Sequence, residues 1–301
     1  MRKEKFKLLD KSRPIVQEYL SFIKLRNQIW ADKYIHKREQ NYRGDKILET
    51  YFFANIWRDC DKFSREEIRR LRKLKTFKEQ LKLILIGRHS LSWTTTDLLL
   101  TKSTTLKDVY AHWEECKKTG GLFVSNAISM YPKEGTDRAI EVFTHRNEVF
   151  EHLDEIESAI LKPNRPPIYL LSKFPQLLSC VGMFRAYEFY TSLTYTSQIK
   201  FREDDIFLVG PGAIDGLTYV TGHEFNAVDC NAALIDLKDL VKEELLKDKN
   251  FIWIPKDLQG SINNKEEHKF TVRTLEDTLC EFRKYTNIKA GTGRRRKYYR
   301  S

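Results

Sequence analysis

Gly210, Pro211 and Gly212, followed by Asp229, are the residues of this sequence best suited to chemistry on an anionic partner. Two residues without a Cβ flank a fixed φ angle, so the backbone can turn tightly and approach another molecule closely. A helix that starts at Ala213 would direct its free N–H groups into this turn and form an anion site suited to a DNA phosphate. Asp229 lies seventeen residues after Gly212, which leaves room for one helix and a return. This order predicts a backbone turn that holds DNA, followed by one helix and then an aspartate.

Two further groups of polar residues have helical spacing. Asn55, Arg58 and Asp61 recur every three residues, so a helix would place them on one face. Glu281 is followed one turn later by Lys284. Both groups also fit a solvated helix face with ordinary ion pairs, and only a further argument can favour a functional role.

Asp229 has a structural alternative. It precedes a predicted helix over residues 231–247, and an aspartate in that position commonly caps the free N–H groups of the helix. Capping and a role toward a substrate therefore both stay open.

The composition indicates a folded protein with an anionic partner. The 301 residues include 41% hydrophobic and 32% charged residues, with a formal charge of +11. No stretch has the roughly 20 apolar residues of a membrane span, and the start resembles no secretory signal, so we expect a cytosolic protein without a membrane partner. The five cysteines contain no Cys-x-x-Cys pair, and the histidines show no paired metal spacing, so no metal site is predicted.

The apolar periodicity predicts a mainly α fold. Helices are expected over 14–38, 45–60, 137–161 and 231–247. Capping-box patterns begin at Ser64, Thr76, Thr105 and Thr274. We expect one helical domain over 1–301, with an optional split into two lobes near the prolines at 162–168 and a basic tail at 289–301. The basic run at 69–75 fits a solvated face or general phosphate contacts.

Three blocks in this order resemble the α-glutamyl/putrescinyl thymine pyrophosphorylase family, the bacteriophage amino acid:DNA transferases of thymine hypermodification. They are the arginine-rich residues 22–70, VGPGAIDGL at 209–217, and LCEFRKYTNIKAGTGRRRKYY at 279–299. The resemblance implies a helix-hairpin-helix DNA glycosylase-like fold. It implies a transferase that replaces the pyrophosphate of 5-pyrophosphoryloxymethyluracil in DNA by an amino acid or polyamine. It also implies double-stranded DNA with a flipped base as partner and the cytoplasm of an infected bacterium as location.

The resemblance assigns roles to particular residues. Asp229 would act as a general base toward the incoming amine, or orient it, with Glu281 as second carboxylate and Lys284 beside it. Pyrophosphate would be bound by a set from the first block: Arg26, Arg38, Asn55, Arg58 and Asp61. DNA would be bound by the hairpin and the tail: Gly210, Pro211, Gly212, Ala213, Arg294, Arg295, Arg296 and Lys297. Trp57 and Tyr51 could stack on the extruded base, or belong to the core.

No cofactor is required in this interpretation, although Mg²⁺ could accompany the pyrophosphate. The sequence contains no Gly-x-x-x-x-Gly-Lys-Ser/Thr motif, so a separate hydroxymethyluracil DNA kinase would act first. A DNA glycosylase is the nearest alternative, because fold, hairpin and aspartate would be shared. A DNA-binding protein without catalysis would tolerate loss of Asp229 and Glu281. A dinucleotide site fails, because Gly216 is one residue too far for Gly-x-Gly-x-x-Gly and the alternating strands are not predicted.

Overall fold

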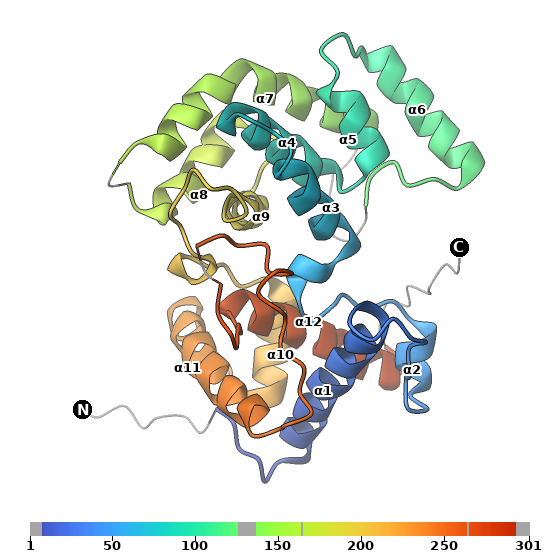
Figure 1. Cartoon of the computed structure of the whole chain (residues 1–301), viewed down its shortest axis with the longest axis vertical. Helices are drawn as coiled ribbons and strands as arrows, with labels where there is room; N and C mark the ends of the chain where they lie inside the picture. The colour runs from blue at the N-terminus through green and yellow to red at the C-terminus, as the bar shows by residue number, and fades with distance from the viewer. Residues whose placement is uncertain (1–7, 126–136, 164, 264, 293–301) are drawn as a thin grey trace. The chain divides into compact units, whose positions relative to one another are not determined.

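The computed structural model describes residues 8–125, 137–163, 165–263 and 265–292. Every regular element in those ranges is a helix, which confirms the predicted mainly α fold (Figure 1). Within the same ranges, no helix combines the length and apolar character needed to cross a membrane. The chain forms two compact units. Unit 1 comprises residues 1–61, 207–259 and 265–301, and unit 2 comprises residues 62–206 and 260–264.

Unit 1 is assembled from segments far apart in the sequence. Its helices are α1 (Pro14–Tyr34), α2 (Lys46–Thr50), the 3₁₀ helix η1 (Arg58–Cys60), α10 (Pro211–Thr221), α11 (Ala227–Leu246) and α12 (Val272–Lys289). The last of these, α12, packs most extensively on α10 and also contacts α1, α2 and α11. An aromatic cluster joins the first and last segments, since Tyr19 and Phe22 lie 5.1 and 5.5 Å from the ring of Phe282. The core of unit 1 therefore depends on both ends of the described chain.

Two glycines explain the close approach of α10 to α12. A Cβ on Gly212 would lie 2.7 Å from the Cys280 sulfur, and one on Gly216 would lie 2.4 Å from the Leu279 carbonyl oxygen. Neither glycine has a positive φ. Their small size, rather than an unusual backbone conformation, is what the packing of these helices requires.

Unit 2 surrounds α4. Its helices are α3 (Lys62–Leu71), α4 (Phe77–Ser90), α5 (Trp93–Leu100), α6 (Leu106–Thr119), α7 (Arg138–Leu161), α8 (Pro167–Leu177), α9 (Met183–Leu193) and the 3₁₀ helix η2 (Glu203–Asp205). The last eight residues of α4, from Leu83 to Ser90, are all buried, and α4 contacts α3, α5, α7 and α9. Residues 162–168, where a split was expected as an option, connect α7 to α8 inside unit 2.

Only some of the helix-capping patterns predicted from the sequence are present in the structure. The capping boxes at Thr76 with Glu79 and at Thr105 with Asp108 are present. The one predicted at Ser64 is wrong, because α3 already begins at Lys62. Ser64 instead accepts a hydrogen bond from Arg88 in the core at 3.1 Å. Arg88, more than twenty residues later in the sequence, therefore binds the side chain that the local pattern assigned to a helix N-terminus.

Candidate functional site

An extended segment of unit 1 carries much of the predicted site. The helix predicted over 45–60 is wrong beyond Thr50, because residues 52–55 have no regular structure and a short 3₁₀ helix follows at 58–60. Phe53 and Trp57 in this segment are buried in the core. Trp57 contacts Trp30 edge to face at 6.2 Å, which supports its role as a core residue. Burial of these aromatic side chains, rather than helical periodicity, determines the path of the segment.

Side chains of α1 and α12 satisfy the backbone of this extended segment. Arg26 donates hydrogen bonds to the carbonyl oxygens of Phe53 and Ala54, at 3.0 and 2.8 Å. Glu281 accepts one from the Ala54 N–H at 3.1 Å, and Lys284 donates one to the Phe52 carbonyl oxygen. Backbone groups outside a helix need such partners when they are shielded from water. Arg26 is 3% exposed, so the structure gives it an anchoring role in the core.

Asp61 is the acceptor on which the polar residues of the first block converge. Its carboxylate accepts from the Asn55 N–H at 3.1 Å and from the Asn55 side chain at 3.2 Å. Arg58 forms an ion pair with it at 3.4 Å. The predicted grouping of Asn55, Arg58 and Asp61 is present, although a turn and a 3₁₀ helix produce it rather than the face of one α-helix.

Burial raises the pKa of Asp61 to about 6, against the opposing effect of Arg58 and the Asn55 N–H. The carboxylates of Asp277 and Glu281 raise it further by repulsion. The Asp61 side chain nevertheless retains 19% of its exposure. A carboxyl group in this position can both reach a solute and exchange a proton near neutral pH.

The face of α12 brings further charges to this cluster. Glu281 pairs with Lys284 at 3.2 Å, as their spacing predicted. Arg273 lies 3.5 Å from the Asp277 carboxylate and 3.9 Å from that of Glu276. The Oδ2 atom of Asp277 is buried and has no hydrogen-bond partner among the described residues. We define the charged cluster as these side chains of unit 1: Asn55, Arg58, Asp61, Arg273, Asp277, Glu281 and Lys284.

Sequence reasoning missed Arg273 and Asp277. It assigned Asp277 to a helix cap that begins at Thr274, whereas α12 begins at Val272 and is capped by Thr271, whose hydroxyl accepts from the Thr274 N–H at 3.2 Å. The usable signal was the spacing of 273, 277, 281 and 284, which places all four side chains along one helical face.

The predicted hairpin is the start of α10. That helix begins at Pro211 rather than at Ala213, and Gly210 is its N-cap residue. The Gly210 N–H donates to Glu276 of α12 at 3.2 Å, and Ala213 is fully buried. Packing against α12 thus gives a structural reason for this sequence, and contact with DNA stays a prediction.

Asp229 and Arg38, like Arg26 and the predicted hairpin, lie outside the charged cluster. Asp229 is the third residue of α11, not the residue before it, and it exchanges two hydrogen bonds with Asn226 at 2.7 and 2.9 Å. Asn226 therefore occupies the capping position that was predicted for Asp229. Arg38 follows α1 and pairs with the buried Asp32 at 2.5 Å.

Burial opposes ionisation of Asp32, but the hydrogen bonds donated by Gln28, Arg38 and the Asn41 N–H together lower its pKa. Arg294, Arg295, Arg296 and Lys297, in the basic tail, lie outside the described residues. No group of three or more His, Cys, Asp or Glu side chains is placed to hold a metal ion in the part of the chain that the structure describes.

Comparison with known proteins gives one family and one curated relative. Residues 13–294 match the family described as 5-hmdU DNA kinase, helical domain. The relative is the 5-hmdU DNA kinase of Bacillus phage SP10, which is 24% identical over 296 residues. The match covers 88% of this chain and 44% of the relative, so the chain spans less than half of that protein. No solved structure matches.

Proposed function

The chain belongs to the family of 5-hmdU DNA kinase helical domains, and from this premise we propose that it modifies thymine-derived bases in phage DNA. In detail, it would replace the pyrophosphate of 5-pyrophosphoryloxymethyluracil in DNA by an amino acid or a polyamine. The observation that carries this proposal is the charged cluster, in which carboxylates and cations alternate around a partly exposed Asp61. The relative's name supports the substrate, because it refers to the 5-hydroxymethyl base from which such a pyrophosphate would derive.

The proposed reaction breaks one bond and forms another. The C–O bond between the exocyclic methylene and pyrophosphate breaks, and pyrophosphate leaves with the electron pair. A C–N bond forms from the lone pair of the amine to the same carbon. The amine enters as an ammonium ion, so one proton must be removed before its nitrogen can attack.

The charged cluster offers a group for each need. Asp61 accepts the proton from the ammonium ion, with its raised pKa making it a stronger base than an ordinary carboxylate. Glu281 and Asp277 attract the ammonium ion by their negative charge. Arg58 and Lys284 present positive charge to the departing pyrophosphate. No resident cofactor is needed, and any Mg²⁺ would arrive with the pyrophosphate.

Phosphorylation is a different task. The relative carries the name of a kinase, but this chain spans only 44% of it and contains no Gly-x-x-x-x-Gly-Lys-Ser/Thr motif. That motif cradles nucleotide phosphates in P-loop enzymes. We therefore propose that the kinase step precedes the step catalysed by this chain and uses another active site.

The proposal retains a helix-hairpin-helix, glycosylase-like use of α10 and α11 for holding DNA. Gly210 to Gly212 open α10, and Asp229 lies in the first turn of α11, which preserves the predicted order of turn, helix and aspartate. Gly212 is partly exposed at the start of α10, so a backbone phosphate could approach there. Double-stranded DNA with the modified base extruded is the proposed partner.

The decisive experiment is a reaction with defined DNA. Oligonucleotides that carry 5-pyrophosphoryloxymethyluracil are incubated with the protein and a panel of amines, and nucleosides are analysed by mass spectrometry. We expect pyrophosphate release matched by an amine adduct on the base. Release of free base with an abasic site would instead identify a DNA glycosylase. If neither an adduct nor pyrophosphate forms with any amine, the transferase proposal is rejected.

A further inference from the structure

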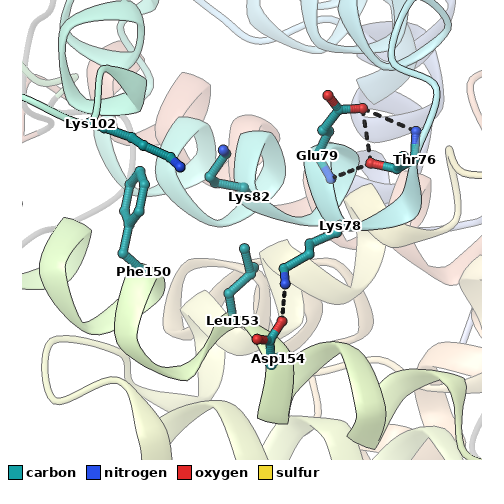
Figure 2. Close-up of a pocket in the computed structure, with 8 residues that line it drawn as sticks. All are labelled: Thr76, Lys78, Glu79, Lys82, Lys102, Phe150, Leu153 and Asp154. Atoms are coloured by element: carbon teal, nitrogen blue, oxygen red, sulfur yellow. Dashed lines mark hydrogen bonds and ion pairs between the residues drawn. The ribbon is translucent and has the colours of Figure 1, made fainter.

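Unit 2 has a groove that the proposed reaction does not use. The groove lies between the first half of α4, the middle of α7 and the loop after α5, and its volume is about 280 Å³. Its lining residues are Thr76, Lys78, Glu79, Lys82, Lys102, Phe150, Leu153 and Asp154 (Figure 2). This volume is at the lower limit of small-ligand sites, so the groove suits part of a nucleotide rather than a dinucleotide cofactor.

The two acidic residues of the groove are already engaged. Glu79 accepts hydrogen bonds from the backbone and side chain of Thr76 in a capping box. Asp154 forms an ion pair with Lys78. Lys82 and Lys102 form no ion pair with a carboxylate within the described ranges, although the hydrogen bonds of Thr76 and the charge of Lys82 lower the pKa of Glu79. Figure 2 shows the Lys102 side chain extending toward Lys82. With three lysines and two carboxylates in its lining, the groove carries a net positive charge, and the ammonium groups of Lys82 and Lys102 are outside any ion pair of the described residues.

An aromatic ring lies beside these charges. The Lys82 ammonium is 5.3 Å from the centroid of the Phe150 ring, and the Arg146 guanidinium is 4.6 Å from it. Arg146 is fixed in the core by hydrogen bonds to the carbonyl oxygens of Leu99 and Thr101, at 3.0 and 2.8 Å. The Phe150 ring therefore packs against the fixed Arg146 guanidinium and remains partly exposed to the groove.

The groove continues a basic segment of the surface. Arg72, Lys73 and Lys75 lie in the connection between α3 and α4, directly before the groove residue Thr76, and all are exposed. Arg69 and Arg70, earlier in the same run, are instead paired with Glu66 and Asp97. The basic run at 69–75 therefore has two parts. The first part forms ion pairs, and the second part faces solvent next to the groove.

We propose that this groove binds an unpaired DNA strand, with Lys82 and Lys102 at a phosphate and Phe150 against the adjoining base or sugar. A basic groove beside an exposed aromatic ring is the combination by which proteins hold single strands without reading their sequence. The basic segment 72–75 extends the path of the strand beyond the groove. This site lies wholly within unit 2 and is separate from the charged cluster of unit 1.

The test compares two lysine pairs of equal charge. The double variant Lys82→Ala with Lys102→Ala removes the groove ammonium groups. The control Lys107→Ala with Lys118→Ala removes two exposed lysines of α6 in the same unit, outside the groove. Binding to an unmodified, fluorescently tagged single-stranded oligonucleotide is measured by anisotropy over a salt series.

Loss of two phosphate contacts should lower the slope of log affinity against log salt by about 1.4 and the affinity about 20-fold at 0.1 M salt. The control pair should change both values much less. Equal effects of the two pairs would overturn the proposal. Because unmodified DNA is bound without turnover, this result is independent of whether the transferase reaction occurs.

The ring is tested with Phe150→Leu, which keeps apolar volume against Leu153 and Arg146. Affinity for the single strand should fall about fivefold, while affinity for a duplex should stay nearly constant, because paired bases cannot stack on the ring. Equal losses for single strand and duplex would overturn the assignment to an unpaired strand. Circular dichroism of each variant verifies that the helices remain folded.

Discussion

The charged residues of the two units differ in exposure and in the balance of their charges. In unit 2, Arg88 pairs with Glu67 at side-chain exposures of 2% and 0%, and Ser192 completes the network. In unit 1, Arg58 and Asp61 retain 21% and 19%, with the like-charged Asp277 and Glu281 nearby. A buried and well-partnered ion pair defines a scaffold, whereas a partly exposed group with repelling neighbours is prepared for proton transfer.

The largest expected effect breaks the scaffold of unit 2. Arg88→Met leaves Glu67 buried without its cation, and such a change costs about 3–5 kcal/mol. Urea unfolding should show this loss. Combining Arg88→Met with Glu67→Met and Glu188→Gln should recover much of it, because both buried carboxylates that pair with Arg88 are then removed as charges. A loss below 1 kcal/mol in the single variant would show that the network of unit 2 is not structural.

The next effect concerns the chemistry of unit 1. Asp61→Asn keeps an oxygen that can accept from Asn55 but removes the proton acceptor, so pyrophosphate release should slow about 100-fold. The rate is measured with the pyrophosphorylated oligonucleotide and a reactive amine. Asp236→Asn is the matched control, since Asp236 is an exposed carboxylate on α11 of the same unit, and it should stay within a few-fold of the parent. Equal losses in both variants would remove the distinction between these carboxylates.

A third effect tests the helix contact that supports the charged cluster. Gly212→Ala places a methyl group 2.7 Å from the Cys280 sulfur and should cost about 1–3 kcal/mol. Adding Cys280→Ala removes that sulfur and should restore most of the stability. Stability is read from urea unfolding and DNA binding from anisotropy. If the double variant is stable but binds duplex DNA weakly, Gly212 also serves DNA contact, whereas full recovery of binding limits its role to packing.

The smallest effect is a pH dependence that belongs to unit 1 alone. Asp61 must be ionised to accept a proton, so with a pKa of about 6 the rate should fall about tenfold at pH 5. Its folded pKa lies above the ordinary value, so the folded state binds the proton more tightly. Asp61 therefore makes unfolding easier as the pH rises from about 4 to about 6. The pH profiles of rate and of stability for Asp61→Asn should lack both changes. If either pH-dependent change is retained, it belongs to another titrating group.

Local signals predicted the fold better than the site. Thr76 and Thr105 cap their helices as predicted, because each capping box is complete within four residues. Ser64 and Glu67 carry the same pattern but bind Arg88, which lies more than twenty residues later. Spacing alone cannot reveal such a competitor.

The site residues illustrate the same limit. Asn55, Arg58 and Asp61 were grouped correctly on the assumption of a helix that does not form. Their grouping depends on burial of Phe53 and Trp57 and on contacts from α12, which are properties of the folded core. Asp277 was not predicted as a site residue, because a helix-capping pattern already explained its position. Its place on the same helical face as Glu281 could nevertheless be derived from the sequence spacing.

The interrupted course of unit 1 has a consequence for biosynthesis. Tyr19 and Phe22 leave the ribosome before unit 2, yet their partners Thr278 and Phe282 follow more than 250 residues later. Nearly all of unit 2, which comprises residues 62–206 and the short segment 260–264, is translated in between. Unit 2 can therefore fold while α1 still exposes its apolar side, and the closing of unit 1 must wait for α12. The nascent chain consequently passes through a long interval in which α1 is open to chaperones and to aggregation.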